Sequence, residues 1–260
     1  MQLIDYWKQF DPSRYPYIHP HDMNILKDIN SPKHFKNSPS TYQEYLLSAN
    51  FGMHDDSRMD LSLLPIPYAG DLKNSKVVIL LLNPGLHYSD YYGEYDRPEY
   101  RKRLIDNIQQ DFSGVDFPFL WLDPNLSWHA GFQWWEKKLR TVIKKLAERR
   151  FNDSYYEALK FASKNIAQIE LIPYHSTIFK SRNLVRDLAS AKESVNFART
   201  ILQADAISGK RKIIITRQVG EWGLPKSENI ITYDGHQARS ASLGVNGAGG
   251  SAILEKLLAS

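Results

Sequence analysis

An apolar run that ends in an Asn-Pro-Gly turn is the part of this sequence best suited to chemistry. Residues 76–82 are almost entirely apolar and lead directly into Asn83, Pro84 and Gly85. Such a run is typical of a central strand covered on both faces, and open α/β sheets bind ligands beyond the carboxyl ends of their strands. Asn83 is therefore a candidate to hold a water or a ligand. Alternatively, its side chain only closes an Asx-type turn.

Polar side chains also follow the other expected strands, namely Glu170 and His175 after the second, Arg217 after the third and His236 after the fourth. Because the carboxyl ends of parallel strands lie along one edge of a sheet, these groups can converge on Asn83. Histidine exchanges protons near neutral pH, so His236 and His175 are candidates to protonate or hydrogen-bond a leaving group. Alternatively, either histidine is a packed or surface residue.

Strands that alternate with helices predict an α/β fold, a three-layer α/β/α sandwich with a four-stranded, mainly parallel central sheet. The strands are expected at 76–82, 166–172, 212–216 and 229–233, and the main helices at 40–49, 98–109, 131–150, 153–163, 190–208 and 248–258. The run 88–94 is expected to form a long loop, and the proline-broken segment 116–124 to line a pocket or an edge. Seven prolines before residue 70 predict an irregular N-terminal extension, residues 1–70, packed on one α/β domain, residues 71–260.

Composition excludes several kinds of site. The chain has 260 residues, 42% of them hydrophobic, which is enough for a substantial core. It has no cysteine, which excludes disulfides, thiolate metal sites, iron–sulfur clusters and a thiol nucleophile. No run approaches the roughly 18 apolar residues of a membrane span, and the first residues do not resemble a signal peptide, so we expect a cytoplasmic protein without a membrane partner. His19 and His21 lie in an irregular segment, and we expect no metal and no cofactor.

The charge and the aromatic content permit a nucleic-acid partner without requiring one. The formal net charge is +4, the isoelectric point is near 9.0, and 12% of the residues are aromatic. Basic groups contact phosphates and aromatic rings stack on bases, although aromatic-rich cores have the same composition. Trp134 and Trp135 are expected to pack in the core. The glycine-rich run Gly244–Gly250 is expected to bring N–H groups against a phosphate at the start of the last helix.

The run Leu-Asn-Pro-Gly-Leu at 82–86 resembles the first motif of the uracil-DNA glycosylase superfamily, in the Asn-Pro-Gly form of its mismatch-specific branch. The resemblance covers about residues 70–258 and implies that Asn83 holds the attacking water. Residues 234–242 stand where the family has its His-Pro-Ser-type wedge loop, but the prolines of that loop are missing. The resemblance implies a double-stranded DNA partner whose target base is flipped out, and no iron–sulfur cluster. We expect a monomer.

Glu170 stands where the family places the residue that reads the base edge. A carboxylate only accepts hydrogen bonds, which suits the amino group of cytosine and opposes the carbonyl of uracil. Alternatively, the Glu170 side chain points away from the site or pairs with a nearby cation. Candidates to stack on or bind the base are Tyr88, Tyr91, Phe119 and His175, and candidates to contact DNA are Lys180, Arg182, Arg217, Arg239 and Ser240.

The resemblance, taken with these residues, implies a monofunctional DNA glycosylase. It would hydrolyse the N-glycosidic bond of a flipped, 5-substituted cytosine and leave an abasic site. A weaker resemblance to bacterial glycosylases that attack hypermodified cytosine suggests glucosylated cytosine in phage DNA, and hence anti-phage defence. Three alternatives stay open: a repair glycosylase for uracil or mismatched thymine, a hydrolase of free nucleosides, and a catalytically inert nucleic-acid- or partner-binding module.

Overall fold

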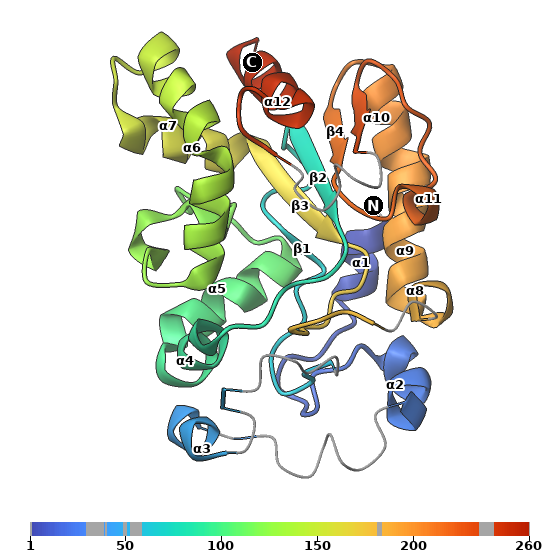
Figure 1. The fold of residues 1–260 in the computed structure, drawn as a ribbon. Helices are drawn as coiled ribbons and strands as arrows, with labels where there is room; N and C mark the ends of the chain where they lie inside the picture. Colours follow the sequence, from blue (N-terminus) through green and yellow to red (C-terminus); the bar gives the residue numbers. More distant parts are fainter. Residues whose placement is uncertain are drawn as a thin grey trace. The chain divides into compact units, whose positions relative to one another are not determined.

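The computed structural model describes residues 2–29, 39, 41–48, 51–52, 59–180, 184–233 and 242–259, and it has an α/β fold (Figure 1). The helices are α1 (Gln2–Trp7), α2 (Met23–Ile29), α3 (Tyr42–Leu47), α4 (Tyr88–Asp96), α5 (Pro98–Gln109), α6 (Ala130–Arg150), α7 (Tyr155–Asn165), α8 (Leu184–Asp187), α9 (Ala189–Phe197), α10 (Gln203–Ile207), α11 (Val219–Trp222) and α12 (Ala248–Leu258). Short 3-10 turns lie at Pro20–Asp22, Leu120–Leu122 and Pro124–Leu126, and a π-helical turn at Ala198–Leu202 joins α9 to α10.

Five strands form one mixed sheet in the order β1-β3-β2-β4-β5. They are β1 (Tyr68–Ala69), β2 (Val77–Leu81), β3 (Ile166–Glu170), β4 (Lys212–Ile215) and β5 (Ile230–Thr232). β2 pairs parallel with β4, and β4 pairs parallel with β5. β3 also runs parallel to β2, because Lys76 N–H donates to Asn165 O at one end and Ile172 N–H donates to Leu82 O at the other. β1 is antiparallel to β3.

The sheet therefore has one strand more than the four that the sequence predicts. All four predicted strands are present within two residues of the expected bounds. The additional strand, β1, is only two residues long and is too short to give an alternating pattern. Gly70 ends it at a φ of +88°, and a side chain at this position would lie 2.6 Å from Ile166 O. This close approach brings β1 against β3.

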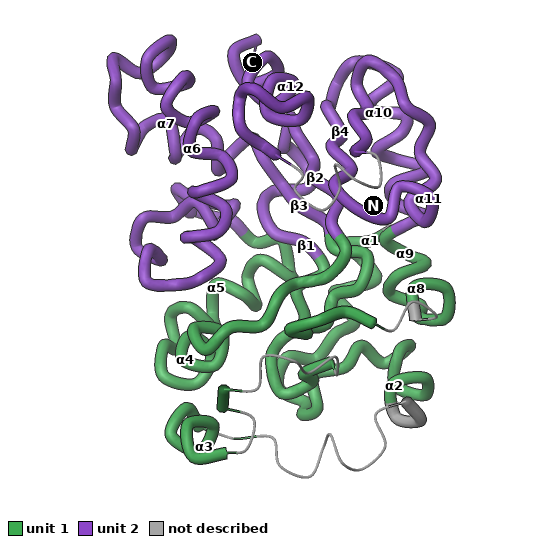
Figure 2. The backbone as a smooth tube through the Cα atoms, in the orientation of Figure 1, with its two compact units in different colours: residues 1–67, 82–111, 170–194 green, residues 68–81, 112–169, 195–260 purple. Residues whose placement is uncertain are grey.

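The chain divides into two compact units (Figure 2). Unit 1 comprises residues 1–67, 82–111 and 170–194, and unit 2 comprises residues 68–81, 112–169 and 195–260. In unit 2, α6 packs on α7 and α12, and α12 also packs on β4 and β5. The apolar face of α6 is buried there, through Leu139, Val142, Ile143 and Leu146.

Unit 1 contains more helix than its prolines suggest. α1 is present because Leu3, Ile4 and Trp7 make one apolar face, and all three are at most 1% exposed. The expectation of a single helix before residue 70 is therefore wrong, since α1 and α2 precede α3.

The expectation of a long loop at 88–94 is also wrong, because this run lies in α4. His87 begins α4 through a capping box: Ser89 N–H donates to His87 Nδ1, and His87 N–H donates to the Asp90 carboxylate. One side of the helix then buries Tyr91 beside Tyr45 and Leu63. Among the described residues, no helix is both long and apolar enough to cross a membrane.

Candidate functional site

The candidate site lies in unit 1, where the turn after β2 meets the segment after β3. Ile172 N–H donates to Leu82 O at 2.8 Å, and Ser176 N–H donates to Pro84 O at 3.3 Å. The segment after β3 thus continues beside the turn, which brings Asn83 to Ser176. The sequence predicts that these two strand ends converge, and Asn83, Glu170 and His175 all lie on the two segments.

The amide of Asn83 is held by two hydrogen bonds. Its Nδ2 donates to Ser176 Oγ at 2.9 Å and to Pro84 O at 2.8 Å. Both bonds use the donor side of the amide, so the carbonyl oxygen Oδ1 has a fixed direction. Within the described part of the chain Oδ1 accepts no hydrogen bond, and the side chain is only partly buried. Asn83 therefore presents an oriented acceptor at the end of a buried strand.

His175 is tied to the same turn. Its ring is 2% exposed, and Nδ1 lies 2.7 Å from Gly85 O. A carbonyl oxygen only accepts, so Nδ1 carries the proton, and in the neutral ring the lone pair is on Nε2. Nε2 is buried and has no hydrogen-bond partner among the described residues. His175 Nε2 can therefore accept a hydrogen bond without disturbing the hydrogen bond between Nδ1 and the turn.

Asp60 binds the main chain of His175, and Tyr91 binds the side chain of Asp60. Asp60 N–H donates to His175 O at 2.8 Å. The Asp60 carboxylate accepts from Ser62 N–H and Ser62 Oγ on Oδ1, at 2.8 and 2.6 Å, and from the Tyr91 hydroxyl on Oδ2. Burial and the adjacent Asp60 charge raise the pKa of Tyr91, so its hydroxyl stays protonated and donates.

Tyr88 and Tyr91, the two tyrosines predicted to contact the base, have different surroundings. The Tyr91 ring is 2% exposed and stacks on Tyr45 at a centroid distance of 3.7 Å, so neither face is open to a base. Tyr88 is partly exposed, and its ring lies 5.0 Å from that of Phe51, which is 45% exposed. Only Tyr88 of this pair retains surface for contact with a ligand.

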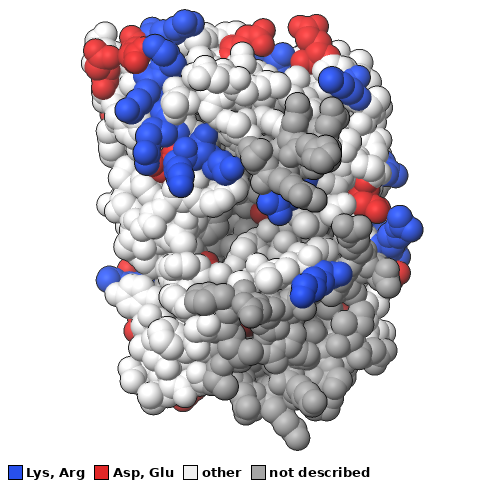
Figure 3. All heavy atoms as spheres, in the orientation of Figure 1, with Lys and Arg blue, Asp and Glu red and all other residues white. Residues whose placement is uncertain are grey.

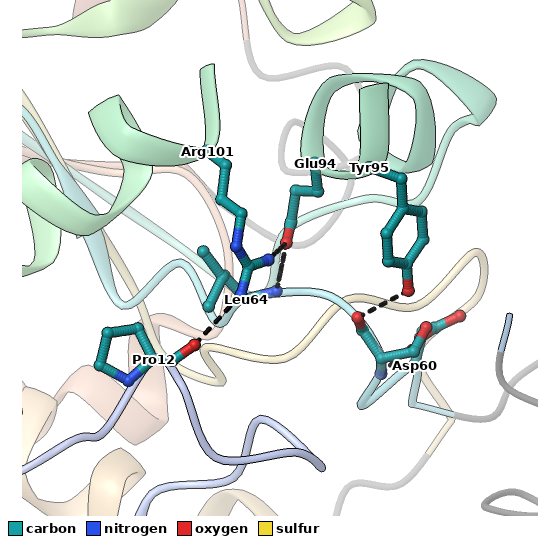
Figure 4. Close-up of polar contacts among 7 residues, drawn as sticks. Pro12, Asp60, Leu64, Glu94, Tyr95 and Arg101 are labelled. Atoms are coloured by element: carbon teal, nitrogen blue, oxygen red, sulfur yellow. Dashed lines mark hydrogen bonds and ion pairs between the residues drawn. The ribbon is translucent and has the colours of Figure 1, made fainter. Parts of the chain in front are cut away.

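A second polar network in unit 1 fixes α4 and α5 to the N-terminal segment (Figure 4). The buried Glu94 carboxylate accepts from Leu64 N–H and from Arg101 Nη1, both at 3.0 Å. Arg101 Nη2 donates to Pro12 O at 3.1 Å. Burial raises the pKa of Glu94 well above its usual range, and the hydrogen bonds from Leu64 and Arg101 oppose this shift. Tyr95, in the same helix, donates to Ser62 O at 3.0 Å.

Glu170 ends β3, is 2% exposed, and donates its N–H to Pro67 O at 2.9 Å. Lys180 is exposed in the segment that follows. The proposed roles of these two residues in base reading and DNA contact stay predictions. Arg182, His236, Arg239 and Ser240 lie outside the described residues.

Phe119 and Arg217 belong to unit 2. Phe119 is fully buried and meets Trp135 edge to face at 5.0 Å, so neither face is open to a base. The neighbouring 3-10 turn Leu120–Leu122 is buried too, and this segment contributes to the core. Arg217 is exposed just after β4.

The phosphate cradle expected at Gly244–Gly250 is not supported, because several of its N–H groups are already bonded within unit 2. Val245 N–H donates to Thr141 Oγ1 at 3.0 Å, Gly247 N–H to Gly244 O at 2.9 Å, and Gly249 N–H to the Tyr233 hydroxyl at 3.0 Å. The glycines are required by close packing instead: a side chain at Gly250 would lie 1.9 Å from Gly244 O.

The close-spaced histidines near the N-terminus have a structural role in unit 1. His19 is fully buried, with Nε2 3.0 Å from Tyr6 O, and its N–H donates to the Tyr174 hydroxyl at 3.2 Å. Tyr174 in turn donates to Asp22 at 2.7 Å. No group of three or more potential metal ligands occurs in the ranges that the structure describes. Sequence reasoning missed this network because Tyr174 lies more than 150 residues from His19 and Asp22.

The turn at Asn83 can orient a water through Oδ1, and the adjacent segment carries His175, whose buried Nε2 has no hydrogen-bond partner among the described residues. No protein-family model, curated protein or solved structure matches this chain.

Proposed function

We propose that this protein is a monofunctional DNA glycosylase of the uracil-DNA glycosylase superfamily. The observation that carries the proposal is the Asn83 amide, whose donor atom is bonded to Ser176 and Pro84 while Oδ1 points away from both. An acceptor fixed at the carboxyl end of a buried parallel strand is suited to hold a reacting water. The four parallel strands β3-β2-β4-β5 agree with the four-stranded sheet of that superfamily.

In the proposed reaction, Asn83 Oδ1 accepts a hydrogen bond from the attacking water. The bond between the sugar C1′ and the base nitrogen breaks, and its electron pair leaves with the base. The water oxygen then bonds to C1′ and releases a proton, for which His175 Nε2 is a suitable acceptor. A neutral amide is a weak base, so the rate depends on positioning and on stabilising the departing anion. We therefore expect a slow enzyme.

For the substrate we propose a flipped pyrimidine of the cytosine type. Glu170 is a buried carboxylate at the end of β3, and a carboxylate accepts from the cytosine amino group but opposes the uracil carbonyl. We further propose that the base carries a bulky 5-substituent such as glucose, as in phage DNA. The partly exposed Tyr88 is a suitable surface for a base or a sugar.

The test uses matched oligonucleotides with uracil, cytosine, 5-hydroxymethylcytosine or glucosylated hydroxymethylcytosine, scored for alkali-sensitive abasic sites. We expect cleavage of one modified cytosine and a loss of about 100-fold in kcat in Asn83→Ala, the scale of one lost transition-state contact. Ser176→Ala frees the amide and should lower kcat by a smaller factor, about 10-fold, with KM unchanged. No abasic sites on any DNA would overturn the proposal, and equal rates for Asn83→Ala would overturn the role of Asn83.

A second candidate is a catalytically inert nucleic-acid-binding module. It is favoured by the hydrogen bond from Asn83 Nδ2 to the adjacent Pro84 O, which also serves to close a turn. In that case Asn83→Ala would lower stability while DNA binding per folded molecule stayed the same. Measuring the unfolding free energy and DNA affinity of the same variant separates the two functions.

A further inference from the structure

Two adjacent tryptophans at the start of α6, in unit 2, have opposite surroundings. Trp135 is 4% exposed and packs against Phe119, as expected from the sequence. Trp134 is 46% exposed, so the expectation that it lies in the core is wrong. Neighbouring positions on a helix point about 100° apart, and α6 buries only one face. The Trp134 ring packs on Trp135 at a centroid distance of 4.9 Å and an angle of 83°, which holds it in place.

One cation lies over this exposed ring, and two more lie close to that cation. The ammonium of Lys138, one turn along α6, lies over the Trp134 ring, 5.4 Å from its centroid. Burial, together with the like charges of Arg217 and Lys137, lowers the pKa of Lys138. Neither Arg217 nor Lys137 forms an ion pair with any residue in the described ranges. These cations therefore repel one another, and an anion placed among them would be stabilised.

The rest of α6 extends the positive charge. The helix has seven basic and two acidic residues, and Figure 3 shows Lys and Arg side chains gathered where Figure 1 places α6. Both acidic residues are already paired: Glu136 with Arg140, at 2.6 Å, and Glu148 with Lys145, at 2.6 Å. They leave Lys137 without an ion-pair partner among the described residues of this helix.

We propose that Trp134, Lys137, Lys138 and Arg217 form a binding surface for single-stranded nucleic acid. An unpaired base would stack on the exposed indole while its flanking phosphates contact the cations. The chemistry favours a single strand over other polyanions, because an acidic peptide needs the cations but not the ring, and in a duplex the base faces are covered. The inference rests on the proposed function only in taking nucleic acid as the partner, and it adds a binding surface separate from the Asn83 turn.

The experiment measures binding of a fluorescein-labelled oligothymidylate, which contains no substrate base, by polarisation at several salt concentrations. Trp134→Ala should weaken binding about 10-fold or more, since stacking contributes roughly 1–3 kcal/mol per base. Arg217→Gln should weaken binding and lower the slope of log K against log salt by about 0.7. Tyr156→Ala, which removes a 50% exposed aromatic from α7 in the same unit, and Lys145→Gln are the matched controls, and their affinities should change little.

The inference would be overturned if Trp134→Ala bound as tightly as the wild type, or if a duplex of equal length bound equally well with the same dependence on Trp134. Displacement by polyglutamate at equal charge concentration would also overturn it. Asn83→Ala separates this inference from the proposed function, because it should slow the formation of abasic sites about 100-fold and leave oligothymidylate binding unchanged. Binding through Trp134 by a protein that excises no base would support the surface and refute the glycosylase.

Discussion

Replacing Tyr91 with Phe tests whether the Asp60 carboxylate holds the candidate site in place. Among the described residues, Asp60 Oδ2 accepts a hydrogen bond from Tyr91, whereas Oδ1 accepts two hydrogen bonds from Ser62. The Asp60 main chain in turn donates to His175 O. The substitution removes one hydroxyl, and the ring can keep its stacking on Tyr45.

The expected loss in the free energy of unfolding depends on whether the hydrogen-bond acceptor is charged. A hydrogen bond to a charged group contributes about 1.5–3 kcal/mol, and one between neutral groups about 0.5–1.5 kcal/mol. Tyr95→Phe is the matched control, because it removes the same hydroxyl from the same helix but from a neutral acceptor, Ser62 O. We therefore expect a loss of about 2 kcal/mol for Tyr91→Phe and about 1 kcal/mol for Tyr95→Phe.

Urea unfolding followed by circular dichroism measures both losses. With a urea dependence of about 2 kcal/mol per molar, Tyr91→Phe should lower the midpoint by about 1 M and Tyr95→Phe by about half as much. Hydrogen exchange at the Asp60 amide should also become faster in Tyr91→Phe, because this amide donates to His175 O. The reasoning is refuted if the two variants lose equal stability, or if Tyr91→Phe leaves exchange at Asp60 unchanged.

Two further predictions concern packing and pH. Gly250→Ala should destabilise the protein by more than about 2 kcal/mol, since the new side chain would meet Gly244 O at 1.9 Å. The control is Gly220→Ala in α11, where a new side chain would meet nothing within 4 Å and should cost less than about 0.5 kcal/mol. Thermal unfolding measures both changes. Burial lowers the pKa of His19 below its usual 6.5, so the unfolded chain binds a proton that the folded protein resists. The stability that neutral His19 contributes is therefore present above pH 6.5 and falls as the pH drops below 6.5. In His19→Gln, the urea midpoint should fall less between pH 7.5 and pH 5.5 than in the wild type. The same pH profile in both proteins would contradict this assignment.

Local sequence determined most of the secondary structure. The run at 76–82 contains β2, because the five apolar residues Val77–Leu81 suit a buried pleated position, and the bounds of α5 and α12 are those expected. Proline at the first position of α5 and the apolar spacing of α12 act over a few residues, so they can be read from the sequence alone. The adjacency of the segments that follow β2 and β3 was also expected, because parallel strands place their carboxyl ends at one edge of the sheet.

Tertiary structure decided what the local pattern leaves open. The sequence of α4 predicts a loop because its tyrosines, aspartates and Gly93 are weak helix formers, yet the helix forms where Tyr91 can pack on Tyr45 and donate to Asp60. Trp134 and Trp135 have the same type and adjacent positions, and only the direction of the α6 core separates the exposed ring from the buried one. The hydrogen bond between Asn83 and Ser176 joins residues 93 positions apart. Such contacts depend on how distant segments pack, so no window of the sequence determines them.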